Sequence, residues 1–230
     1  MSEREFVEYK VKENDSIYKL AMQFNTSIDR ILIANPKIDV YNLEIGKRLI
    51  IPTGDIISVN TEYNSKMLFE DITSLKILYP FLEVGEIGKS VLGKPLYYIK
   101  IGKGQRSVFY NGSFHANEWI TTPVLMKFAE EYLKSIVDGK KIYGYDAKLL
   151  YNYTSLYIVP MVNPDGVDLV TGSLENVDNI YEKVDKIAND FPEIPFPSGW
   201  KANINGVDLN LQFPAGWQQA REIKYSQGFT

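Results

Sequence analysis

Asn111-Gly-Ser-Phe-His115-Ala-Asn-Glu118-Trp119 contains the only histidine among the 230 residues. It follows an apolar run, Ser107-Val-Phe-Tyr110, that predicts a buried strand, and it precedes a helical pattern that begins near Pro123. A neutral imidazole and a carboxylate three positions apart can serve as a pair of zinc ligands. The alternative is a histidine that is only hydrogen-bonded within a loop, because 29 acidic residues make this spacing common by chance.

Strand-like runs alternate with helical patterns on both sides of this segment. We expect a helix over 64–78, an antiparallel strand pair over 82–91 and 96–101, and a strand over 155–162. The last strand ends at Asn163-Pro-Asp-Gly166, which predicts a turn. Alternation of strands and helices indicates an α/β sheet.

Residues 8–53 form a separate compact unit in the order strand, helix, helix, strand. Tyr9-Lys-Val11 is strand-like, Asn14-Asp-Ser16 and Thr26-Ser27 are helix starts, the second helix ends at Asn35-Pro36, and 46–52 is the closing strand. Residues 54–62 are then expected to be a linker, and residues 63–230 a second domain.

Composition excludes several classes of protein. The net charge of −4 and the pI near 5.2 argue against a nucleic-acid partner, since such domains usually have a basic face. No apolar stretch approaches the 18 residues or so of a membrane span, so no membrane partner is expected. The absence of cysteine excludes disulfides and thiolate metal sites. Because the N-terminus lacks an apolar signal segment, a cytoplasmic location is the default, with spore or cell-wall association as the alternative.

The first unit resembles the LysM module. The likeness rests on Tyr9-x-Val11 followed by Asp15-Ser-Ile17, on Ala34-Asn-Pro36, and on Leu43-x-Ile-Gly46 followed by Pro52. It implies a βααβ domain that binds peptidoglycan, chitin or another N-acetylglucosamine-containing glycan in a shallow groove beside the strand–helix loops. The alternative is a small domain that serves another interface. The glycan-binding candidates are Asn14, Asp15, Ser16, Pro36, Lys37 and Ile38.

The rest of the chain, over roughly residues 60–230, resembles the zinc carboxypeptidase family. Three motifs follow one another in the family's order, which is far more specific than His-x-x-Glu alone: Gly112-x-x-His115-x-x-Glu118-Trp119, Val159-Pro-Met-Val-Asn163-Pro-Asp-Gly166 and Trp200-Lys-Ala-Asn-Ile-Asn-Gly-Val-Asp-Leu-Asn210. The expected architecture is therefore an α/β chain, a βααβ LysM domain followed by a zinc-carboxypeptidase-type sheet domain.

The resemblance implies a role for each matching residue. His115 and Glu118 become the first two zinc ligands, and Asn210 becomes the side chain that binds the substrate's carboxylate beside the scissile bond. Lys201 falls near an arginine with which the family polarises the scissile carbonyl, although lysine is a point charge without the arginine fork. The alternatives are a solvated loop lysine at 201 and a structural turn residue at 210.

The residue after Asn210 separates subgroups of the family. True carboxypeptidases carry an arginine there that clamps the terminal carboxylate, whereas this chain continues with Leu211-Gln-Phe-Pro-Ala215. That run, with a LysM module in front, resembles the bacterial γ-D-glutamyl-L-diamino acid endopeptidases, which cut peptidoglycan stem peptides, often during sporulation. A glycan-binding module suits that substrate, because tethering raises the effective concentration of the cleavable peptide.

The family's third zinc ligand is a histidine well downstream of Asn210, followed by a tyrosine and a glutamate that acts as general base. This chain has no second histidine, so the third ligand is absent from it, and we expect a truncated peptidase domain. Three functions stay open: a zinc metallopeptidase acting on peptide substrates of the cell wall, a non-catalytic glycan-binding protein with an inactive peptidase remnant, and a true carboxypeptidase or amide-cleaving deacylase.

Overall fold

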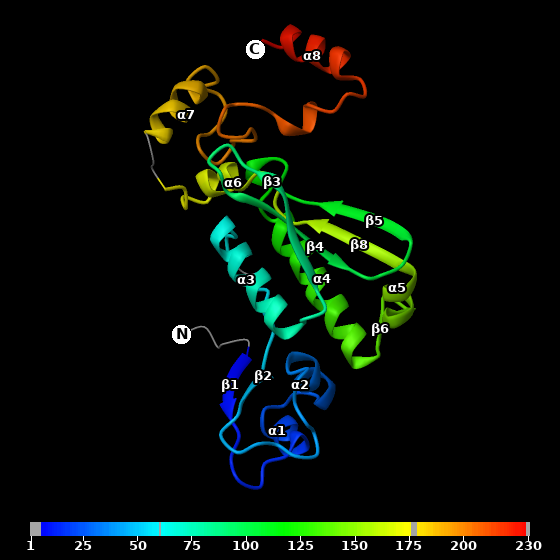
Figure 1. Ribbon diagram of the computed structural model, residues 1–230. Helices are drawn as coiled ribbons and strands as arrows, with labels where there is room; N and C mark the ends of the chain where they lie inside the picture. The colour runs from blue at the N-terminus through cyan, green and yellow to red at the C-terminus, as the bar shows by residue number, and fades with distance from the viewer. Residues whose placement is uncertain (1–5, 60, 176–178, 229–230) are drawn as a thin grey trace.

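The computed structural model describes residues 6–59, 61–175 and 179–228. Figure 1 shows an elongated arrangement. The N-terminal unit lies at one end, the C-terminal helices lie at the other, and a sheet with two long helices lies between them.

The N-terminal unit has the predicted order of elements. Strand β1 (Phe6–Lys10) pairs antiparallel with β2 (Arg48–Pro52), and helices α1 (Ile17–Gln23) and α2 (Ile28–Ala34) lie between them in the chain. Each helix begins at a serine whose side chain accepts a backbone N–H three residues on, which compensates a donor without a partner in the first turn. The core of the unit consists of Val11, Ile17, Leu20, Ala21, Ile31, Leu49 and Ile51.

Asn35 explains why α2 ends where it does. Its side-chain amide donates to the carbonyl oxygens of Ile31 at 2.8 Å and Ile50 at 2.7 Å, and its Oδ1 accepts the N–H of Ile50 at 2.9 Å. One side chain thus caps the helix and joins it to β2.

The second unit is built on a four-stranded sheet in the order β3-β4-β8-β5. Strands β3 and β4 are antiparallel, β4 and β8 are antiparallel, and β8 and β5 are parallel. The strands are β3 (Glu83–Lys89), β4 (Pro95–Ile101), β5 (Arg106–Asn111) and β8 (Thr154–Val159). The mixed α/β fold class is confirmed.

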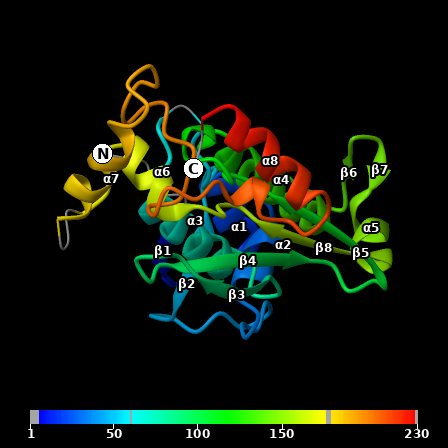
Figure 2. The same ribbon diagram turned by 90° about the horizontal axis from the view of Figure 1, so that it is seen from above.

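Two long helices share the main core with this sheet. Helices α3 (Ser65–Leu78) and α4 (Thr121–Asp138) contribute buried residues beside those of β4 and β8. The β6–β7 hairpin (Lys141–Ile142, Tyr145–Asp146) and α5 (Ala147–Tyr153) follow α4, and Figure 2 shows them at the side of the molecule away from α7. No helix among the described residues is long and apolar enough to cross a bilayer.

A second, smaller core lies beyond the sheet. It joins the short helix η1 (Ala116–Glu118) to α6 (Pro164–Val170), α7 (Ile180–Ala188) and the loop that contains Trp200 and Ile204. The chain then continues through η2 (Leu209–Leu211) to α8 (Trp217–Ser226).

Two local predictions were wrong. The run Ser107–Tyr110 forms β5, but only Val108 is partly buried, because β5 is the last strand of the described sheet and Phe109 is 59% exposed. Asn163–Gly166 begins helix α6 instead of forming an isolated turn. Asn163 accepts the N–H of Gly166 as an N-cap, and Pro164 occupies the first helical position, where a missing N–H has no cost.

Candidate functional site

The site lies where β5 and β8 end. These two strands are parallel, so their carboxyl ends meet at one edge of the sheet. The loops that follow are joined by backbone hydrogen bonds from Val162 N–H to Gly112 O and from Asn163 N–H to Ser113 O, both 3.0 Å. A side chain at Gly112 would approach Pro160 O to 2.8 Å, so this close contact requires glycine.

The loop that contains His115 is anchored by buried hydroxyl groups. Ser113 is 2% exposed and has a φ of 49°; its N–H donates to Thr121 Oγ1 at 2.8 Å, and its Oγ lies 2.7 Å from Thr122 Oγ1. Thr122 Oγ1 also donates to Pro160 O at 2.6 Å. The first turn of α4 therefore holds the loop in place.

His115 lies between two carboxylates, one on each side of its ring. Nδ1 is 3.0 Å from Glu118 Oε1, and Nε2 is 3.2 Å from Asp208 Oδ1. The His115 side chain is 16% exposed, whereas that of Glu118 is 50% exposed. Asp208 Oδ1 also accepts the N–H of Asn210 at 3.0 Å, as the cap of η2.

Asn163 connects the histidine loop to the segment that carries Asp208. It is 2% exposed, and its amide Nδ2 donates to Ala202 O at 2.9 Å, with longer contacts to Phe114 O at 3.4 Å and Lys201 O at 3.5 Å. A backbone contact also joins the histidine loop to this segment: the N–H of Ala116 donates to Lys201 O at 3.0 Å. The buried Asn163 thus joins two other stretches of the chain, 113–116 and 201–202.

The four residues predicted for the peptidase site fall in this one region. His115 and Glu118 touch, Asn210 is bonded through its N–H to Asp208, and the main chain of Lys201 is bonded to the η1 turn. The side chains of Lys201 and Asn210 are exposed. A hollow of about 370 Å³ is lined by Phe114 and Leu209, which adjoin His115 and Asn210 in the chain, and by Gln212 and Phe213 among others.

Sequence reasoning missed the parts played by Asp208 and Asn163. Both stood in the quoted motifs, two residues before Asn210 and at the start of Asn-Pro-Asp-Gly. Asp208 is 93 residues from His115 in the chain, and no local spacing indicates such a pairing. Asn163 precedes a proline, and this pair of residues is typical of a helix N-cap followed by the first helical position, so the sequence held a signal for its role.

The loops predicted to bind glycan are each held within the N-terminal unit. Asp15 Oδ2 accepts the N–H of Lys12 at 2.7 Å and the hydroxyl of Tyr9 at 2.9 Å, and Ser16 caps α1. Asn14 has a φ of 64°, and its carbonyl accepts Lys19 Nζ at 2.7 Å. In the second loop Pro36 and Lys37 are exposed, while Ile38 is half-buried against the core of the unit.

Comparison with known proteins agrees with both resemblances. Residues 70–228 match the zinc carboxypeptidase family, and residues 9–52 match the LysM domain. The chain is 46% identical over 166 residues to the γ-D-glutamyl-L-diamino acid endopeptidase 1 of Lysinibacillus sphaericus, which covers 72% of this chain and 41% of that protein. It is 42% identical over 158 residues to protein YqgT of Bacillus subtilis, covering 68% and 41%.

A more distant relative is carboxypeptidase E of Caenorhabditis elegans, with 32% identity over 139 residues, 56% of this chain and 24% of that protein. The chain thus spans less than half the length of each of these relatives. The family match covers well over half of the chain itself, including the histidine loop, the Asn163 segment and η2. The chain therefore belongs to the zinc carboxypeptidase family and carries a LysM domain ahead of that family's domain.

Proposed function

We propose that this chain is part of a zinc metallopeptidase that cleaves peptidoglycan stem peptides between γ-D-glutamate and a diamino acid. The observation that carries the proposal is the His115–Glu118 pair beside Asn210 within the family's domain. The LysM domain and the name of the Lysinibacillus relative support the substrate. The protein would then belong at the cell wall or the spore.

The donor atoms present fit two positions of a catalytic zinc site. Nδ1 of His115 and Oε1 of Glu118 converge, while Asp208 holds the other ring nitrogen. A carboxylate behind a metal-binding histidine orients the ring and fixes its tautomer, so the arrangement favours Nδ1 as the ligand atom and Nε2–H as a donor to Asp208. Catalytic zinc usually has three protein ligands, and the chain's single histidine and lack of cysteine leave the third to a carboxylate or to residues outside these 230.

When bound, zinc supplies Lewis acidity for attack of water on an amide. The chain's own residues would bind and orient the peptide. Asn210 would hydrogen-bond the substrate beside the scissile bond, and the ammonium group of Lys201 would stabilise negative charge on the carbonyl oxygen. Because Leu211 replaces the arginine clamp of true carboxypeptidases, a free terminal carboxylate has no bidentate partner at that position. This difference favours cleavage within a stem peptide over removal of a C-terminal residue.

The LysM domain would bind the glycan. Peptidoglycan and chitin share N-acetylglucosamine, and the candidate contacts are the loops of Asn14 to Ser16 and Pro36 to Ile38. The exposed ring of Pro36 and side chain of Lys37 suit a shallow carbohydrate groove better than the half-buried Ile38 does.

The test compares defined peptides by mass spectrometry. The zinc-loaded samples are the 230-residue chain and a hybrid in which it replaces the matching 41% of the Lysinibacillus relative. We expect the hybrid to cleave a γ-D-glutamyl-diamino acid peptide and to leave a plain C-terminal peptide intact. The chain alone should be inactive, since a general base by itself contributes roughly 10²–10⁴-fold and, among the described residues, the carboxylates that contact His115 are the proposed ligand Glu118 and the orienting Asp208.

The controls concern the predicted ligands. His115→Ala and Glu118→Gln should abolish turnover, whereas Glu182→Gln, at an exposed position in the first turn of α7, should not. Preference for the plain peptide would contradict the proposed specificity, and turnover that survives His115→Ala would contradict the proposed site.

The presence of only one histidine favours a second candidate, a non-catalytic wall-binding protein. In that case the chain pellets with insoluble peptidoglycan and the folded, zinc-containing hybrid cleaves no stem peptide. Binding without cleavage by the hybrid would decide for this second function.

A further inference from the structure

One helix connects the candidate metal site to the LysM domain. Helix α4 begins at Thr121, three residues after Glu118, and its 18 residues end at Asp138, where α4 contacts α2 of the LysM domain. At 1.5 Å per residue the helix is about 27 Å long. Figure 1 shows it running from the centre of the molecule, near α6, toward the LysM unit. The two candidate binding regions are thus joined by a rigid element.

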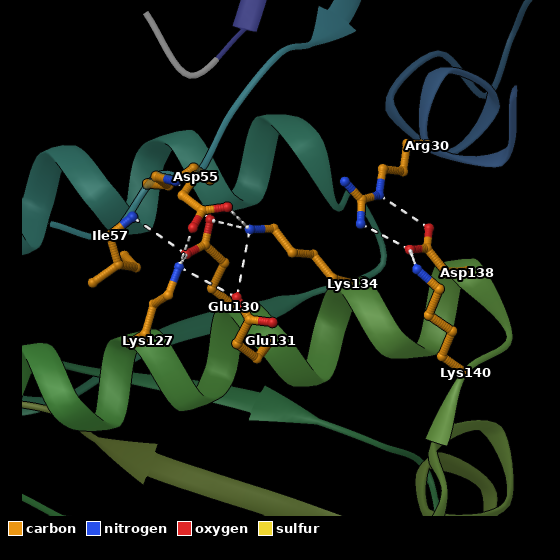
Figure 3. A network of polar contacts seen from close by, with 10 residues as sticks. Arg30, Asp55, Ile57, Lys127, Glu130, Glu131, Lys134, Asp138 and Lys140 are labelled. Carbon is orange, nitrogen blue, oxygen red and sulfur yellow. Dashed lines mark hydrogen bonds and ion pairs between the residues drawn. The ribbon is translucent and has the colours of Figure 1, made fainter. Parts of the chain in front are cut away.

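The segment between the two domains is held against this helix. Glu130 of α4 is fully buried, and its carboxylate accepts the N–H of Ile56 at 2.6 Å and of Ile57 at 3.4 Å. Lys127 Nζ lies 2.9 Å and Lys134 Nζ 3.1 Å from the same carboxylate. Both isoleucine side chains are buried in the main core. Figure 3 shows the linker lying on α4 with these charges between them, so the linker does not behave as a free tether.

A second contact fixes the LysM domain itself. Arg30 of α2 forms a bidentate pair with Asp138, with Nε to Oδ1 at 3.0 Å and Nη2 to Oδ2 at 2.8 Å, as Figure 3 shows. The Asp138 side chain is 9% exposed, and Lys140 Nζ lies 3.1 Å away. Ala34 at the end of α2 is buried in the core of the peptidase domain.

The contact between α2 and α4 is polar at its edge and leaves space beside it. A hollow of about 440 Å³ lies there, lined by residues of both domains that include Leu32, Ile33, Phe81 and Tyr151. Next to this hollow Ala34 and the partly buried Ile33 pack against the main core, and the ion pair and the Glu130 contacts add polar restraints at fixed points. We call Arg30–Asp138 and Glu130 with its two backbone donors the interdomain joint.

We propose that the interdomain joint makes the protein specific for polymeric glycan strands. The LysM domain holds the strand at a fixed distance from His115, and the peptide bound at the site is attached to a different disaccharide of that strand. The proposal rests on the function proposed above. A stem peptide of about four residues spans roughly 14 Å when extended, which is shorter than α4. Because the α2 contact lies at the end of this helix away from Glu118, we infer that the sugar bound by the LysM domain is not the one that carries the peptide. A flexible tether would impose no such spacing.

The first test measures the joint without any ligand. The chain lacks cysteine, so spin labels at Glu44→Cys in the LysM domain and Tyr145→Cys in β7 report one distance by double electron–electron resonance. Both positions are exposed. We expect a single narrow distance distribution that broadens in Arg30→Gln and in Glu130→Gln. The matched control Arg48→Gln alters an exposed pair with Glu8 inside the LysM domain and should leave the distribution narrow.

Two results would overturn the rigid joint: a broad distribution in the otherwise unchanged chain, or a distribution that neither joint variant alters. Arg30→Gln changes a partly exposed residue, so it decides the question if Glu130→Gln fails to fold. This measurement needs neither zinc nor turnover, and its result stands apart from the proposed activity.

The second test measures binding of the same chain to three probes: bare glycan strands, strands that carry stem peptides, and a single disaccharide with its peptide. We expect peptide-bearing strands to bind at least about tenfold more tightly than the other two. Arg30→Gln should remove that gain and leave the affinity for bare strands unchanged. Equally tight binding of the single disaccharide with its peptide would overturn the proposal, whereas failure to bind bare strands would contradict the glycan part of the proposed function instead.

Discussion

His115 is restrained at both ring nitrogens by residues from two different segments. Glu118 belongs to the same turn, so the three-residue spacing marked the pair as candidate ligands, and the order of the three motifs gave it a role. Asp208 comes from η2, and its approach depends on the folding of the whole 200–210 loop onto η1. A local pattern can therefore predict candidate ligands, but not the carboxylate that orients them, because that contact exists only in the folded domain.

The contacts of Asn163 with residues 201–202 also exist only in the folded domain, and their loss should lower its stability. Asn163→Ala removes the N-cap of α6 and leaves Ala202 O without its 2.9 Å donor. We expect a loss of roughly 2–3 kcal/mol in the free energy of unfolding, from the lost cap and the unpaired buried carbonyl. Urea denaturation of the chain measures it.

The control for this prediction is Asn189→Ala. Asn189 is exposed at the end of α7, and its side-chain amide donates to Asp185 Oδ2 at 3.2 Å. Its replacement should change stability by no more than about 0.5 kcal/mol. Equal losses in the two variants would show that Asn163 does not hold the site together.

At the scale of elements, periodicity located four of the eight described α-helices, and it made no prediction for α5, α7, α8 or the β6–β7 hairpin. The antiparallel pair β3–β4, helices α1 to α4 and strand β8 all lie close to their expected ranges. The burial of β5 could not be predicted, because a short apolar run has the same appearance in a central strand and in a strand at the end of a sheet. Helix α6 was missed because Asn-Pro-Asp-Gly is typical of turns and of helix starts alike.

Asn35 gives a prediction at this scale. Asn35→Ala removes three hydrogen bonds that join the end of α2 to β2. We expect the amide proton of Ile50 to exchange with solvent at least about tenfold faster, since a net loss of 1–2 kcal/mol corresponds to that factor. Hydrogen exchange followed by NMR measures it. An unchanged rate at Ile50 would mean that the β1–β2 pairing alone protects this strand.

At the scale of the whole molecule, the pairing of Asp55 in the linker with Lys127 and Lys134 of α4 makes the free energy of unfolding sensitive to acid. Hydrogen bonds from Lys127 and Lys134 hold the pKa of Asp55 at about 2, against a usual value of 3.8, although partial burial acts in the opposite direction. A carboxyl whose pKa is lowered by folding stabilises the folded state above its unfolded pKa. That contribution is complete above about pH 4 and is lost as the pH falls toward 2.

Asp55→Asn tests this dependence. The unfolding free energy of the variant should lie below that of the unmodified chain at pH 5, and the difference should shrink between pH 4 and pH 2. Because the Asp55 side chain is 62% exposed, solvent screening keeps the difference small. Urea titrations at several pH values measure it, and a difference that stays constant across this window would contradict the lowered pKa.

The central claim is that His115 and Glu118 form the metal-binding side of a peptidase site, and the single histidine makes it directly testable. ¹⁵N NMR of histidine-labelled protein has one imidazole to report. On addition of zinc we predict that the Nδ1 resonance shifts, that Nε2 remains protonated toward Asp208, and that Glu118→Gln weakens the effect. Coordination through Nε2, or an imidazole that zinc leaves unchanged, would contradict the account.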